Sequence, residues 1–162
     1  MTTWDAVLAA VTTALTADRA RGREELLTCW ADTGGGDAAH RCVLAHYLAD
    51  LEPGLDEEIA WDRAALTHHE KVRDGDLAPV GIPSARAMLP SLHLNLGDGL
   101  LRRGDVEPAR RHLEAGLAAV DALADDGYGA MVRGGLDRLR ARLHDPARTV
   151  DGTVDAPPQP PG

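Results

Sequence analysis

The chain has no phenylalanine and is poor in aromatic residues generally, with three Trp and two Tyr among its 162 residues. β-Sheets draw on aromatic and β-branched side chains, but this chain has only two Ile and ten Val. This scarcity argues against a β-sandwich, a barrel, or a single-strand nucleic-acid binder that stacks bases on rings. The apolar content is instead dominated by 27 Ala and 22 Leu, which enter helices at little cost, so the composition predicts an all-α protein.

Positive charge, cysteine and long apolar runs are scarce as well. Lys71 is the one lysine, and 26 acidic residues against 17 basic ones give a net charge of −9. Such a chain repels phosphate backbones and anionic lipid, so we expect neither nucleic acid nor a membrane as a partner. Two cysteines make no disulfide framework, no apolar run reaches about 18 residues, and no basic residue precedes the apolar run Val7–Ala17. We therefore expect a cytoplasmic protein.

Apolar residues spaced three and four apart, separated by turn residues, predict seven helices. The expected segments are Thr2–Ala17, Arg23–Asp32, Asp37–Leu51, Asp56–Arg73, Pro83 or Pro90 to Gly104, Asp105–Ala124, and a last helix ending near His144. Gly22 and Gly34–Gly36 are expected breaks, and residues 74–82 an expected loop. Pro90 either begins the fifth helix or bends it. Residues 1–144 are predicted to form one domain, followed by a flexible, Pro-rich tail at 145–162.

Small and large residues alternate through the fifth and sixth segments in a pattern that resembles a tetratricopeptide repeat. The pattern consists of Leu96-Gly97, Leu100, Gly104, Ala109, Leu113 and Gly116-Leu117. Small residues let antiparallel helices approach closely, and a glycine allows a left-handed turn between them. A weaker copy at 41–66 has Leu44-Ala45, Leu48, Trp61 and Ala64 in the corresponding places.

The resemblance implies a short right-handed α-superhelix of about three antiparallel helical hairpins, closed by a C-terminal capping helix. In that family the concave face binds proteins or peptides, so the implied function is a non-enzymatic scaffold or adaptor without a cofactor. The first helix of each hairpin lines that face, and polar residues here recur at helical spacing on two such helices. The implied partner-binding residues are Cys42, His46, Asp50, Ser91, Asn95, Asp98 and Arg102.

Other interpretations of the same residues remain open. The polar residues on these two helix faces would also fit a solvated surface, where Arg102 pairs with Asp98 one turn away. Cys29, Cys42 and His46 are ligand types for zinc, with Asp50 or His40 to complete the set, which would make the chain a metal-responsive or small-molecule sensor.

Two pairs of adjacent residues, one of glycines and one of histidines, lie within predicted helices. Gly134-Gly135 indicates close packing of the last helix on the sixth, or a contact with a second copy of the chain in a self-associating protein. His68-His69 is expected on a solvated helix surface. No sequence pattern of an activated nucleophile or a phosphate-binding loop accompanies these residues, so we expect no enzyme.

Overall fold

The computed structural model describes residues 1–145, and within them the chain is helical without any strand. The predicted all-α class is thereby confirmed, while residues 146–162, most of the predicted tail, lie outside the described residues. Within this range no helix is long and apolar enough to cross a membrane. The elements are α1 (Trp4–Thr16), α2 (Arg19–Asp32), α3 (Ala38–Leu51), α4 (Leu55–His69), η1 (Ala78–Val80), α5 (Ala85–Arg103), α6 (Val106–Ala118), η2 (Val120–Ala122) and α7 (Gly127–His144).

Polar side chains cap most of the helix starts. At each capped start an oxygen accepts a hydrogen bond from a backbone N–H of the first turn, which would otherwise have no partner. Asp105 occupies the predicted position before α6, but its carboxylate accepts from Arg103 Nε at 2.7 Å instead of capping the helix. The capping residues are Thr3, Asp18, Asp37, Ser84 and Asp126.

Several predicted boundaries are wrong. Gly22 is not a break but a buried residue inside α2, which begins at Arg19. The fourth helix stops at His69 rather than Arg73, and the sixth stops at Ala118, with the separate turn η2 after it. The alternatives for Pro90 are also resolved, because Ser84 caps α5 and the proline lies within that helix.

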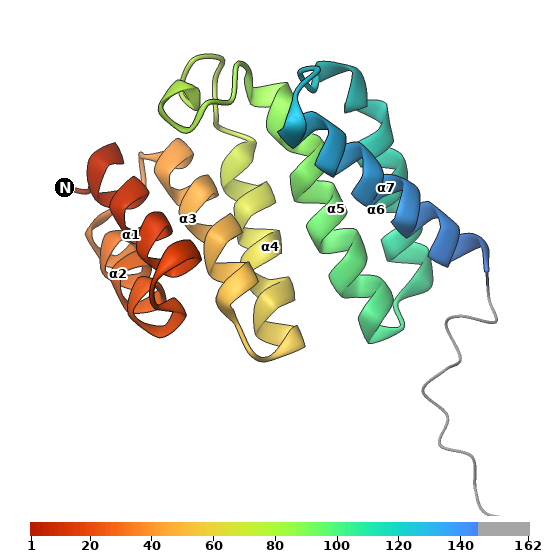
Figure 1. The fold of residues 1–162 in the computed structure, drawn as a ribbon, viewed down its shortest axis with the longest axis horizontal. Helices are drawn as coiled ribbons and strands as arrows, with labels where there is room; N and C mark the ends of the chain where they lie inside the picture. The colour runs from red at the N-terminus through yellow and green to blue at the C-terminus, as the bar shows by residue number, and fades with distance from the viewer. Residues whose placement is uncertain (146–162) are drawn as a thin grey trace, which may run out of the picture.

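Consecutive helices pair as α1 with α2, α3 with α4 and α5 with α6, and α7 lies across α5 and α6 (Figure 1). Gly97 and Gly116 lie where α5 and α6 meet, since an added Cβ at Gly97 would lie 3.5 Å from the Ala109 carbonyl oxygen of α6, and one at Gly116 3.5 Å from the Pro90 carbonyl oxygen of α5. Gly104 ends α5 with a φ of +93°, which a glycine adopts without strain. This hairpin therefore has the close packing and the turn that its sequence pattern predicts.

The last helix packs differently from the expectation. An added Cβ at Gly135 would lie 2.5 Å from Leu94 Cδ2, so the close approach is to α5 and not to α6. Met131, whose helical spacing fits the apolar stripe of this helix, is 62% exposed. The register of α7 thus turns Met131 outward and lays the glycine against α5.

The connection between α4 and α5 is anchored to the core at two points. Leu77 is fully buried, and the His69 ring places Nε2 2.7 Å from the Ala85 carbonyl oxygen. His68 lies edge-on to Trp30, with ring centroids 5.5 Å apart. His69 is therefore buried and His68 half-buried, so the prediction of a solvated surface is wrong for His69.

Candidate functional site

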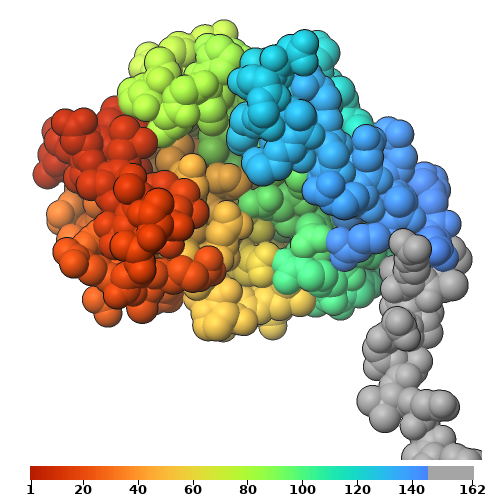
Figure 2. Space-filling model, in the orientation of Figure 1, coloured from red at the N-terminus to blue at the C-terminus, as the bar shows by residue number. Residues whose placement is uncertain are grey.

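One face of the molecule is hollowed along three helices. Figure 2 shows this face, where α3 and α5 lie deeper than α1 on one side and α7 on the other. Three adjoining pockets of about 230, 250 and 260 Å³ fill the hollow. The first two share His46 and Tyr128, and the second and third share Asp50, Asn95 and Arg138. We call this row of adjoining pockets the groove, and its parts the apolar end, the middle and the charged end.

The groove runs parallel to the helices that line it. From the apolar end to the charged end, residue numbers rise along all three helices, from Met88 to Asp98 on α5 for example. Ten residues of α-helix span about 15 Å at 1.5 Å per residue. Because an extended peptide rises about 3.3 Å per residue, the groove has room for about five residues of one.

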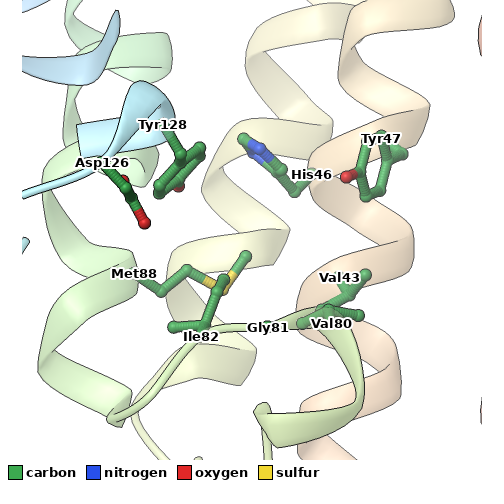
Figure 3. Close-up of a pocket in the computed structure, with 9 residues that line it drawn as sticks. All are labelled: Val43, His46, Tyr47, Val80, Gly81, Ile82, Met88, Asp126 and Tyr128. Atoms are coloured by element: carbon green, nitrogen blue, oxygen red, sulfur yellow. The ribbon is translucent and has the colours of Figure 1, made fainter. Parts of the chain in front are cut away.

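The apolar end lies between α3, the η1 turn and the start of α7 (Figure 3). Gly81, with a φ of +77°, ends η1, and the residues on either side of it enter the pocket wall. Tyr128 donates a hydrogen bond to Ser91 Oγ at 2.9 Å, and Ser91 donates to the Met88 carbonyl at 3.0 Å. This chain of hydrogen bonds holds the tyrosine ring at the pocket mouth. The apolar side chains of the pocket are Val43, Tyr47, Val80, Ile82, Met88 and Tyr128.

His46 and Asn95 face each other in the middle of the groove. The Asn95 amide donates to His46 Nδ1 across 3.4 Å, which links α3 to α5. Burial lowers the pKa of His46, so the imidazole is neutral at pH 7. A neutral imidazole and an amide can each donate and accept hydrogen bonds, which suits the N–H and C=O groups of a peptide backbone.

The charged end holds acids and arginines that are mostly paired. Arg102 bonds both Glu58 and Asp98, and Arg142 also bonds Asp98. Asp50 on α3 is different, because within residues 1–145 its carboxylate has no hydrogen bond or ion pair, and partial burial raises its pKa. Arg138 on α7 likewise lines the groove with its guanidinium unpaired in that range.

A buried acid lies close to this end, on α4. Asp62 is 2% exposed, and its Oδ2 has no hydrogen-bond partner within the described residues. Burial, together with the negative charges of Asp50 and Glu58, raises its pKa from 3.8 to about 8. Asp62 therefore carries a proton at neutral pH.

The structure brings five of the seven predicted site residues together along the groove, namely His46, Asp50, Ser91, Asn95 and Asp98. The other two are placed differently from the expectation. Cys42 is fully buried, with Sγ 3.8 Å from Met88 Sδ, because α5 covers this face of α3 one turn before His46. Arg102 is held by its two acidic partners and does not line any of the three pockets.

Sequence reasoning missed the wall that α7 and the η1 turn contribute. Tyr128, Met131 and Arg138 line the groove, but the last helix was expected to cap the array or to contact a second copy of the chain, not to line the concave face. The sequence held one signal, the glycine pair, of which Gly135 allows α7 to lie close to α5. The exposure of Met131 is a tertiary feature, since its spacing alone fits the apolar stripe.

The ligand set proposed for zinc does not assemble. No group of three or more His, Cys, Asp or Glu side chains within residues 1–145 has the arrangement to hold a metal ion. Cys29 and Cys42 are both buried and unpaired as thiols. Burial raises the pKa of Cys42 to about 12 and also raises that of Cys29.

Both thiols should therefore react slowly in the native protein. We expect a colorimetric disulfide reagent at pH 8 to modify the native chain at least about tenfold more slowly than the chain in guanidinium chloride, because the thiolate is the reactive form and access is blocked. The release of thiolate dye over time measures both rates. Rapid reaction of two thiols in the native protein would contradict the burial of Cys42.

Comparison of the chain with protein-family models, with curated proteins and with solved structures finds no match.

Proposed function

We propose that this protein is a tetratricopeptide-like scaffold or adaptor that binds a segment of another protein in the groove, without catalysing a reaction. The observation that carries the proposal is the alignment of three adjoining pockets along α3, α5 and α7, with lining residues shared between neighbours. Isolated pockets suit small ligands, whereas a groove of about 15 Å suits a short extended chain.

The lining supports a peptide ligand. An apolar pocket at one end can take a side chain, the neutral His46 and Asn95 can hydrogen-bond a peptide backbone, and charges follow at the other end. Binding sites for peptides combine such anchors with a few polar groups that fix orientation. The residues we assign to partner binding are His46, Asp50, Ser91, Asn95, Asp98, Tyr128 and Arg138.

Affinity capture from the source lysate tests the proposal. The wild-type chain is expected to retain a partner that an Asn95→Ala/Tyr128→Ala variant loses, because the variant removes the backbone-binding amide and the ring at the pocket mouth. Quantitative mass spectrometry of the retained proteins compares the two.

An Arg111→Ala/Glu114→Ala variant is the control, since both side chains are exposed on α6 and line none of the three pockets. It should retain the same partner as the wild type. Equal recovery of every protein by the wild type and the groove variant would refute the assignment of the groove.

A further inference from the structure

Two charged side chains on opposite walls of the groove form no hydrogen bond or ion pair with any other side chain of residues 1–145. Asp50 belongs to α3 and Arg138 to α7, and both line the middle and the charged end, so they lie at the same level. The charges around them are different, because Glu58, Asp98 and Arg142 bond one another or Arg102. Among residues 1–145, one acid and one base of the groove are thus left for a ligand.

The apolar end lies at a defined distance from this pair. Its wall on α3 is formed by Val43, His46 and Tyr47, so its centre is about five residues before Asp50. Five residues of α-helix span about 7.5 Å, and two residues of an extended chain span about 6.7 Å. A peptide side chain that enters the apolar end is therefore two positions from the one that reaches Asp50.

We propose that the groove selects an extended peptide with an apolar residue, a basic residue two positions away, and an acidic residue beside the basic one. Neighbouring side chains of an extended strand point to opposite sides, so the basic residue faces Asp50 while the acidic residue faces Arg138. The apolar residue lies on the same side as the basic one and enters the pocket beside Val43 and Tyr47. This inference rests on the proposed function and adds the chemistry of the partner.

Charge complementarity favours this mixed sequence over a peptide of one charge. An acidic peptide would lie beside Asp50 and Glu58, and a basic one beside Arg138 and Arg142. Like charges brought together across an interface weaken binding and suppress wrong partners. Because the other charged side chains nearby are paired, the groove has one site for a positive charge, at Asp50, and one for a negative charge, at Arg138. The order of charges in the peptide therefore decides whether it fits.

Selection from a phage-displayed library of random octapeptides tests the inference on the full chain. The wild type is expected to enrich peptides with the apolar, basic and acidic pattern. An Asp50→Lys/Arg138→Glu variant is expected to enrich the pattern with the two charges exchanged. In fluorescence anisotropy, exchanging the charges in a selected peptide should weaken its binding to the wild type about three- to thirtyfold, as expected for two partly exposed ion pairs.

The control variant exchanges two charges outside the groove. An Arg111→Glu/Glu114→Lys variant, altered on the exposed face of α6, keeps the net charge and should select the wild-type pattern. Thermal unfolding by circular dichroism confirms that each variant is folded.

Two further outcomes separate the inference from the function on which it rests. Peptides that lose binding on Tyr128→Ala but show no preference for charge order would overturn the inference and leave the proposed function standing. No enrichment of any peptide by the folded wild type would overturn both.

Discussion

Replacing Asp62 by Asn is expected to stabilise the protein at neutral pH and to remove much of the pH dependence of its unfolding. The carboxyl group is buried, its Oδ2 lacks a partner within the described residues, and its pKa is raised to about 8 from 3.8. Asparagine has nearly the same shape but does not ionise. The variant therefore keeps the packing of α4 and removes the titration.

The direction of this pH dependence follows from the protons that the folded and unfolded chains bind. Between about pH 4 and pH 8 the folded chain holds the Asp62 proton and the unfolded chain has lost it, so folding takes up a proton. The contribution of this group to stability therefore falls as pH rises through that window, by up to about 1.4 kcal/mol per pH unit. We expect Asp62→Asn to raise the free energy of unfolding by about 2–4 kcal/mol at pH 8 and by much less at pH 5.

Urea unfolding at pH 5, 6, 7 and 8 measures this difference. Asp137→Asn is the control, because it removes a carboxylate from an exposed position of α7, where solvent screens the charge. Its free energy of unfolding should differ from that of the wild type by a similar small amount at every pH. A constant difference between Asp62→Asn and the wild type across this range would contradict the buried, protonated acid.

Gly22→Ala is expected to destabilise the protein, although alanine is the better helix former. An added Cβ at this position would lie 2.4 Å from the backbone Cα and N of Ala14, so α1 and α2 must move apart. Ala14 is itself buried, and a shift of α1 disturbs the core around Leu26. The clash outweighs the gain in helix propensity of about 1 kcal/mol, and we expect a net loss of about 2 kcal/mol or more.

Gly134→Ala measures the effect of helix propensity at a position where the added methyl group meets no close backbone contact. Gly134 lies inside α7, and an added Cβ would meet only the flexible guanidinium of Arg138 at 3.3 Å. This variant should be more stable than the wild type by about 0.5–1 kcal/mol, the ordinary gain for alanine over glycine in a helix. Urea unfolding of both variants gives the comparison, and a Gly22→Ala chain as stable as the wild type would refute the close contact of α1 and α2.

The sequence predicts those features of the fold whose physical cause lies in a few neighbouring residues. The Ala- and Leu-rich composition predicts helices because these residues lose little on entering them. Thr3 and Asp37 cap the helices that were expected to follow them, and Gly104 makes the left-handed turn that its place in the repeat pattern predicts. Each of these features depends on a few neighbouring residues and on little else.

Helical spacing also located part of the groove. His46 and Asp50 lie four residues apart on one face of α3, as do Ser91 and Asn95 on α5, and the structure places all four along the groove. The same rule misplaced Cys42, one turn earlier on α3. Spacing fixes which residues share a helix face, but the curvature of the assembly decides where along the helix that face becomes buried.

The helical class, most helix starts and the α5–α6 hairpin follow from the amino-acid sequence, because propensity, capping and close-packing glycines act over short distances. The second wall of the groove depends on tertiary packing, where α7 lies against Leu94 and turns Met131 and Arg138 toward the groove. Tertiary packing also decides which charges are paired, since Arg102 meets Glu58 across 44 positions of the chain. Such contacts depend on how separate helices pack together, and no short stretch of sequence encodes that arrangement.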